Sequence, residues 1–283
     1  MASVSARNHT TLIHGITAVL AVVLGLAPSD LGVAVSGILI ALLGIPHGSL
    51  DMHLMSTKSL RLRELAIYML CIGLVLSIWI WQPTLMLVLF LVNSAWHFGD
   101  CDIRSSSRLK SLQALVYGIS VLMVLIDLRD STILWILQTL VGNPVDAGIV
   151  PHYGIIRYIS AALVVGLPLF STSKQTRYQL LQSVLVIAVA FLAPSLIAFT
   201  WYFVVVHSWT SMDALRRYVD SKDPWTWRRL IIAAAPLTAL TLVGIGIGYV
   251  LFPGVHLLAI LFIALSALTV PHSRLFHRVY AGQ

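Results

Sequence analysis

The chain has 283 residues, of which 58% are hydrophobic and only 10% are charged. Ordinary soluble domains have about a quarter of their residues charged, so this composition excludes a soluble globular protein and predicts an integral membrane protein. The net charge of +7 does not indicate nucleic-acid binding, because Lys and Arg fall in short clusters between apolar runs, as topology signals do.

Apolar runs recur along the whole chain without a long polar linker, so we expect an all-α fold with one integral membrane domain over residues 1–283. The first run follows a polar start and lacks a convincing signal-peptidase site, so we expect it to remain as a span. The expected spans lie at about residues 12–28, 31–53, 64–82, 84–101, 111–128, 154–170, 179–208, 230–251 and 256–271. Residues 179–208 are long enough for two spans hinged at Pro194. We therefore expect a polytopic transmembrane helical bundle of about ten spans, with eight or nine as alternatives.

The stretch 129–153 fits this scheme less simply. Its apolar piece, residues 131–141, is too short to cross a bilayer, which takes about 20 residues. We therefore expect it to be interfacial or re-entrant.

The basic residues indicate an orientation. The loops after spans 2, 4, 6 and 8 and the tail after span 10 contain nearly all the Lys and Arg, whereas the opposite loops contain essentially Arg129. Cytoplasmic loops of membrane proteins carry such an excess. The N-terminus is therefore predicted to be cytoplasmic.

Four histidines lie near the predicted cytoplasmic ends of four different spans. His47, His97, His207 and His272 are on spans 2, 4, 8 and 10, which all run in the same direction. Imidazole is a common ligand of transition metals, and helical bundles build metal sites from side chains on facing helices. We predict that these histidines converge on a metal ion; the alternative is that each is a satisfied histidine at a helix end.

Acidic and aromatic residues accompany these histidines. Asp51 follows His47 by four residues and Asp100 follows His97 by three, so each carboxylate shares a helical face with a histidine and can accept a hydrogen bond from it. Alternatively, the aspartates mark where the helices meet water. The aromatic residues expected to line an apolar substrate channel, or else to form an interfacial belt, are Trp96, Phe98, Trp201, Tyr202, Phe203 and Trp209.

The nature of the metal follows from the donor atoms. An imidazole-rich site without cysteine suits iron, copper or zinc, and an uncharged set of histidines with open positions suits ferrous iron that binds oxygen. The membrane di-iron desaturase pattern is disfavoured, because it requires histidine pairs three or four residues apart and none is present. We expect no catalytic residues beyond the metal ligands.

The motifs around these histidines resemble those of a known family. They are PHGSLD at 46–51, WHFGD at 96–100, WYFVVVHS at 201–208 and PHS at 271–273. Together, over nearly the whole chain, they resemble the Brp/Blh family of bacterial and archaeal membrane β-carotene dioxygenases. The pair PHGxxD and HFGxxD is fairly specific, and here HFGDCD ends in Asp102.

The resemblance implies an enzyme of a bacterial or archaeal cell membrane that uses non-haem Fe²⁺ and O2. Its substrate would be β-carotene or a related apolar polyene in the lipid bilayer, cleaved at the central double bond to give retinal. The resemblance also implies a ligand role for His47, His97 and His207. Members of the family have a further histidine one turn after the third, where this chain has Ser211; His272 or water replaces it, or the substrate is another polyene.

Two other functions stay open from the residues alone. Intramembrane His and Asp also form proton relays, so a proton-coupled transporter or carrier is one alternative. The other is a metal-dependent enzyme that acts on a different membrane lipid.

Overall fold

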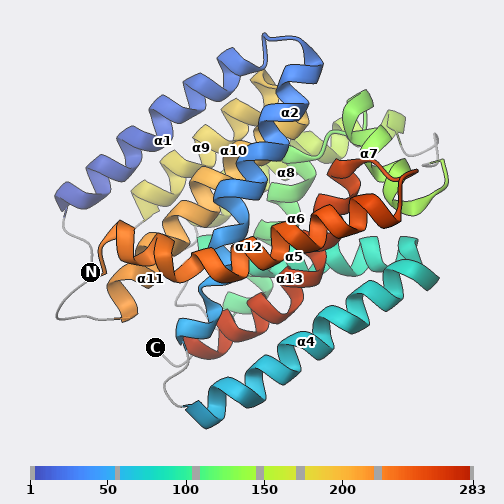
Figure 1. Ribbon diagram of the computed structural model, residues 1–283. Helices are drawn as coiled ribbons and strands as arrows, with labels where there is room; N and C mark the ends of the chain where they lie inside the picture. Colours follow the sequence, from blue (N-terminus) through green and yellow to red (C-terminus); the bar gives the residue numbers. More distant parts are fainter. Residues whose placement is uncertain are drawn as a thin grey trace. The chain divides into compact units, whose positions relative to one another are not determined.

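The computed structural model describes residues 4–54, 58–103, 109–144, 150–169, 176–219 and 225–280. These residues form helices joined by short connections, with no β-strand among them, which confirms the all-α fold class (Figure 1). Several basic residues on which the predicted orientation depends lie outside the described residues, namely Arg104, Arg108, Lys174 and Lys222.

The described residues fall into two compact units. Those of unit 1 lie within Met1–Leu39, Ser94–Trp135 and Pro144–His207, and those of unit 2 lie within Ile40–Asn93, Ile136–Asn143 and Ser208–Gln283. The divisions at residues 39, 93, 135 and 207 fall within continuous helical stretches. Each unit is therefore assembled from segments that are far apart in the sequence.

Unit 1 is built around helices of the first two thirds of the chain. They are α1 (Val4–Leu24), α2 (Ser29–Leu39), the second half of α5 (Pro83–Asp102), α6 (Lys110–Leu125), α8 (Val150–Leu169), α9 (Thr176–Leu192), α10 (Ser195–Trp201) and most of the π-helix η3 (Tyr202–Trp209). Within this unit α6 packs against α8, and α1 packs against α9 and α10 (Figure 1).

Unit 2 combines the segment after α2 with the C-terminal helices. It contains the π-helix η1 (Ile40–Gly44), α3 (Ile45–Ser49), the 3-10 helix η2 (Asp51–Leu54), α4 (Lys58–Trp81), the first half of α5, α11 (Thr210–Val219), α12 (Trp227–Leu251) and α13 (Leu257–Tyr280). Here α13 packs against α4 and α12, and α12 packs against α3. The short helix α7 (Ser131–Val141) contributes residues to both units.

The helix ends follow local sequence signals. Pro83 begins α5, a position where the missing N–H is not needed for the helix. The side chain of Thr226 caps α12 by accepting a hydrogen bond from the Arg229 N–H at 3.2 Å. Gly142 takes a φ of 71° directly after α7, a backbone conformation that favours glycine. Pro194 separates α9 from α10, at the position where the sequence predicted a hinge.

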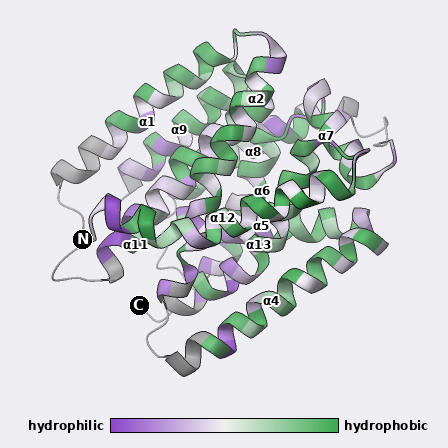
Figure 2. Ribbon diagram, viewed as in Figure 1, coloured by the Kyte–Doolittle hydropathy of each residue, from purple (hydrophilic) through white to green (hydrophobic). Residues whose placement is uncertain are grey.

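The helices are apolar, as a membrane protein requires (Figure 2). Within the described residues, six helices are long and apolar enough to cross a membrane: Ser29–Ser49, Leu62–Trp81, Pro83–Asp102, His152–Leu169, Trp227–Leu251 and Leu257–His277. Four further apolar helices are shorter: Thr10–Leu24, Lys110–Leu125, Ser131–Val141 and Arg177–Leu192. A membrane protein is thus supported, while the count of about ten spans stays a prediction.

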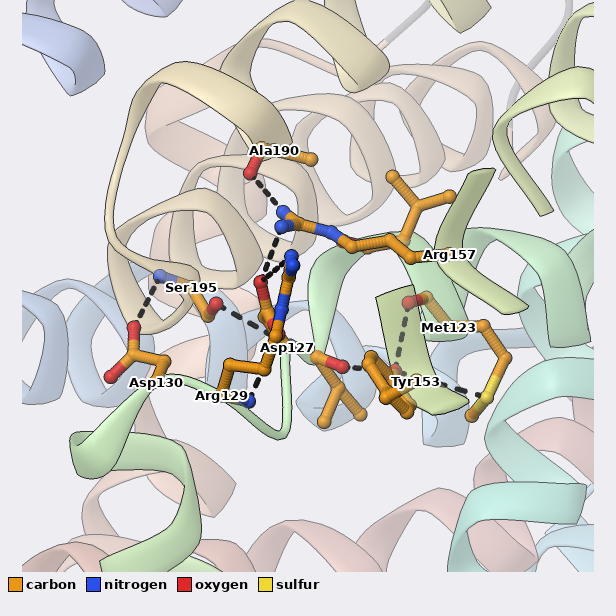
Figure 3. Close-up of polar contacts among 10 residues, drawn as sticks. Met123, Asp127, Arg129, Asp130, Tyr153, Arg157, Ala190 and Ser195 are labelled. Carbon is orange, nitrogen blue, oxygen red and sulfur yellow. Dashed lines mark hydrogen bonds and ion pairs between the residues drawn. The ribbon is translucent and has the colours of Figure 1, made fainter. Parts of the chain in front are cut away.

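A buried arginine in unit 1 is held by an ionic clamp (Figure 3). Arg157, inside α8, forms an ion pair with Asp127. It also donates hydrogen bonds to the backbone oxygens of Val124, at 3.0 Å, and Ala190. The half-exposed Arg129 pairs with the same carboxylate at 2.8 Å. Because a charge in an apolar environment is stable only with partners, this clamp fixes α8 to the end of α6 and to α9.

The clamp continues to the start of α10. The Asp127 N–H donates to the Ser195 hydroxyl at 3.4 Å, and the Ser195 N–H donates to the Asp130 carboxylate at 2.9 Å (Figure 3). Tyr153 of α8 donates to the backbone oxygen of Met123 at 2.8 Å. The connection between α6 and α7 therefore holds one end of unit 1 together through side chains.

Substitutions of Asp127 and of Arg129 should lower the free energy of unfolding by very different amounts. Asp127→Ala leaves the buried Arg157 charge without its carboxylate, so we expect the free energy of unfolding to fall by about 3–5 kcal/mol. Arg129→Ala removes a half-exposed partner and should change it by less than about 1 kcal/mol. Thermal unfolding of the detergent-solubilised variants measures both, and equal shifts would contradict the clamp.

Candidate functional site

Two predicted metal ligands lie in or directly beside π-helical turns. His47 is in α3, immediately after the π-helix η1, and His207 is inside the π-helix η3. π-Helices are rare, and they occur frequently at functional sites, because the extra residue per turn redirects side chains. The local backbone thus singles out both histidines independently of their motifs.

Unit 1 brings His97 and His207 together. Their ring centroids lie 4.8 Å apart at an angle of 77°, and both side chains are buried. Phe98 packs edge-on against His207 at 4.7 Å, and Phe203 lies nearly parallel to it at 6.1 Å. The pair therefore has an apolar, aromatic surrounding.

Glycines allow α5 to carry His97 close to α6. A Cβ atom at Gly99 would lie 1.7 Å from the Ala114 carbonyl oxygen, and a Cβ at Gly118 would lie 1.7 Å from that of Ala95. The two helices thus meet backbone to backbone on both sides of His97. This contact explains why the residue two positions after the histidine in WHFGD has no side chain.

Unit 2 brings together His47 and His272, the other two predicted ligands. Their ring centroids lie 4.3 Å apart at 77°, and both are buried. His272 Nδ1 lies 2.7 Å from Asp51 Oδ1, so the Nδ1–H donates to this buried carboxylate. Tyr68 of α4 donates to the other oxygen of Asp51 at 3.4 Å. A tyrosine, an aspartate and a histidine from three segments thus form one hydrogen-bonded chain.

The Asp51 contact determines which ring nitrogen of His272 can bind a metal. A histidine that donates its Nδ1–H to a carboxylate carries its lone pair on Nε2, and metal-binding histidines commonly have such a partner. The i+4 spacing had suggested Asp51 as the partner of His47, whereas this hydrogen bond links it to His272. Buried imidazole nitrogens of this kind suit iron, copper or zinc.

The remaining predicted residues are spread more widely. Asp100 is half-buried, and the Nδ1 atom of its neighbour His97 lies 3.9 Å from the Cys101 sulfur. Trp201 points to α1, where its indole N–H donates to Thr17 at 3.1 Å. Trp209 stacks on Trp227 in unit 2 at 4.3 Å.

The aromatic residues predicted to line a channel therefore do not form one group within unit 1. Phe98 contacts both Tyr202, at 5.3 Å, and His207, and Phe203 stacks on Phe199 at 5.9 Å. Trp96 is half-buried on α5. Their contact with a substrate stays a prediction for all six residues.

Sequence reasoning missed two residues next to the histidines. Tyr68 lies 17 positions from Asp51, on a helix whose apolar pattern gives no sign of a polar partner, so no signal could have identified it. Asp102 was noted only as the end of HFGDCD; it accepts a hydrogen bond from the buried Tyr202 hydroxyl at 2.6 Å. The motif itself was the signal for this second residue.

Comparison with known proteins finds one family whose matched region contains both histidine pairs. The family described as "Beta-carotene 15,15'-dioxygenase" matches residues 38–280. A protein of that same name from uncultured marine bacterium 66A03 is 27% identical over 259 residues, which cover 86% of this chain and 92% of the relative. No solved structure matches the chain.

The backbone contact between α5 and α6 can be tested with two alanine substitutions. Gly99→Ala forces the helices apart, so we expect the free energy of unfolding to fall by about 3 kcal/mol or more, since overpacking typically costs about 1–3 kcal/mol even against movable side chains. Gly166→Ala in α8 meets no atom within 4 Å and should leave stability unchanged or slightly higher. Thermal unfolding of both variants is the measurement; an unaffected Gly99→Ala protein would disprove the close contact.

Proposed function

The chain belongs to the β-carotene 15,15'-dioxygenase family, and from this membership we propose that it cleaves β-carotene, or a related carotenoid, at the central double bond to give retinal. The observation that supports this most is the extent of the match. Residues 38–280 include all four histidines as well as Asp51 and Asp102. The relative from the marine bacterium carries the same activity in its name.

We propose that His47, His97, His207 and His272 bind Fe²⁺ through ring nitrogens. The burial of each side chain supports this, as does the chemistry of the donor set. His272 takes the place of the family's fourth histidine, because Ser211 offers no nitrogen, while Asp51 already holds His272 with Nε2 as the available donor. When bound, ferrous iron supplies the activation of molecular oxygen.

The protein's own side chains have three tasks in this proposal. Asp51 accepts the His272 Nδ1–H and so keeps the ring in one orientation and one tautomer; Asp100 has the corresponding role for His97. Phe98 and Phe203 present flat apolar faces beside His207, which exclude water and hold a polyene by its shape. Trp96, Trp201, Tyr202 and Trp209 complete the channel for the hydrocarbon ends.

The lipid bilayer is part of this function. Carotenoids dissolve in the hydrocarbon core, so a substrate of this class reaches the protein laterally. The six apolar helices long enough to cross a membrane support such a location. We propose a cell-membrane protein with a cytoplasmic N-terminus, in which residues 1–283 act as one membrane domain.

Expression in a bacterial host that accumulates β-carotene tests the function directly. Wild-type protein should bleach the cells and produce retinal, and His97→Ala should lose at least about 100-fold in retinal yield at equal protein level, because a ligand is removed. His152→Ala changes an exposed histidine of α8 outside the site and should bleach like wild type.

The same experiment separates the alternatives. A transporter or carrier would leave β-carotene intact and contain no stoichiometric metal after purification. An enzyme that acts on another lipid would contain metal and still leave β-carotene intact. Retinal formation by His97→Ala at the wild-type level would refute the proposed ligand set.

Asp51 can be tested through metal content alone. Asp51→Ala should lower the affinity for Fe²⁺ by about 10–100-fold, because the partner that orients His272 is lost. Glu64→Gln removes another buried carboxylate of unit 2, which pairs with Arg274 rather than with a histidine, and should bind iron normally. Titration of the purified apo-proteins with Fe²⁺ measures both; equal affinities would remove Asp51 from the site.

A further inference from the structure

A buried tyrosine and a half-buried aspartate of unit 1 form a hydrogen-bonded pair that has no part in the proposed metal binding. Tyr202 is fully buried, and its hydroxyl donates to Asp102 Oδ2 at 2.6 Å. Asp102 is the last residue of α5, and its backbone oxygen accepts a hydrogen bond from the Gln179 side chain of α9 at 3.2 Å. The side chain and the backbone of Asp102 are therefore each held by a residue of another helix.

Burial makes this pair a strict geometric constraint. A buried hydroxyl without a hydrogen-bond partner costs about 1–3 kcal/mol in proteins, so the Tyr202 hydroxyl is stable only while it keeps the Asp102 carboxylate as its acceptor. A change of the Tyr202 rotamer about Cα–Cβ, or movement of η3 along α5, would break the bond. A hydrophobic residue at either position would pack the same space without fixing this alignment.

The constraint extends to His207 through one aromatic ring. Phe98 precedes Asp102 by four residues on α5, so the two side chains lie on the same helical face. Its ring meets the Tyr202 ring at 5.3 Å and 81°, and it meets His207 at 4.7 Å and 65°. Tyr202 and His207 lie on the same π-helix, five residues apart. Phe98 thus contacts both the anchored phenol and the candidate ligand.

Resting on the proposed function, we propose that Asp102 is a positioning residue that selects the double bond to be cleaved. By holding the Tyr202 phenol, it fixes Phe98 against His207 and so fixes the wall along which a polyene lies. The conjugated double bonds of a carotenoid differ little in reactivity, so their position along the wall decides the product. Cleavage of one C=C bond by O2 places one oxygen atom on each carbon and gives two aldehydes, with no other oxidant.

A loss of this anchor changes the product rather than the metal site. Cleavage at the central bond gives two identical aldehydes, whereas a shift by one conjugated double bond gives a longer and a shorter carbonyl product. Misplacement by about 1 Å is enough to change rates by up to about 100-fold. The lengths of the aldehydes therefore report the position of the substrate.

The test compares four variants with wild type in detergent or lipid: Tyr202→Phe, Asp102→Ala, Asp102→Asn and the double variant Asp102→Ala with Tyr202→Phe. Chromatography separates the aldehydes by length, and kcat, KM, iron content and melting temperature are measured for each protein. The matched control is Tyr153→Phe, which removes another buried phenol hydroxyl of unit 1, 2.8 Å from the Met123 backbone oxygen.

We expect Tyr202→Phe and Asp102→Ala to raise the ratio of off-centre aldehydes to retinal by about tenfold and to lower kcat more than they change KM. The double variant should match the single variants, because both remove the same hydrogen bond. Asp102→Asn keeps an accepting oxygen and should retain most of the central cleavage. Iron content should stay at the wild-type level in all of them, and Tyr153→Phe should keep the wild-type products.

Three results would overturn the proposal. Wild-type products from Tyr202→Phe, with a lower melting temperature only, would make the pair purely structural. Additive effects in the double variant would show that Asp102 does not act through Tyr202. A loss of iron from Tyr202→Phe would place the pair in metal binding. If Asp102→Ala does not fold, the products of Tyr202→Phe alone still decide whether the pair positions the substrate. A wild-type protein that forms no aldehyde refutes the proposed function itself.

Discussion

In an apolar environment, every buried polar group needs a partner within the protein, since hydrocarbon provides none. Three carboxylates in this structure meet that requirement in different ways. Asp127 neutralises the buried Arg157, Asp51 accepts hydrogen bonds from His272 and Tyr68, and Asp102 accepts one from Tyr202. Each joins helices that are distant in the sequence. Because an unpartnered polar group in an apolar environment costs free energy, these bonds favour the one packing arrangement that keeps every partner in place.

One of the three carboxylates stabilises the packing of helices, whereas the other two contact the candidate site. The Asp127 clamp has no histidine or aromatic channel residue in its hydrogen-bonded set and serves the packing of α6, α8, α9 and α10. Asp51 and Asp102 are each linked to a candidate ligand. Asp51 bonds to His272 directly, whereas Asp102 is linked to His207 through Tyr202 and Phe98. A family in which one of many conjugated double bonds must be cut requires both kinds of rigidity: a fixed metal ligand and a fixed wall.

Much of this organisation could be predicted from the sequence. The apolar runs gave the helices, including the short one at 131–141 and the break at Pro194, and the motifs identified four histidines that the structure arranges as two close pairs. Other features depend on tertiary packing and leave no periodic signal. The bond between Asp51 and His272 joins residues 221 positions apart, so spacing along a helix suggested the nearer His47 instead. The span count also stays open, because α1, α6 and α9 are shorter in their apolar parts than a bilayer requires.

The π-helix at Tyr202–Trp209 bears on how relatives should be compared. An α-helical turn takes 3.6 residues, whereas a π turn takes more, so side chains beyond such a segment point elsewhere than α-helical counting predicts. A histidine and a serine aligned at position 211 in two homologues share a place in the alignment, but they share a direction in space only if both proteins wind this segment in the same way. Introducing at position 211 the residue that a relative has there would therefore not guarantee that its side chain points in the same direction as in the relative.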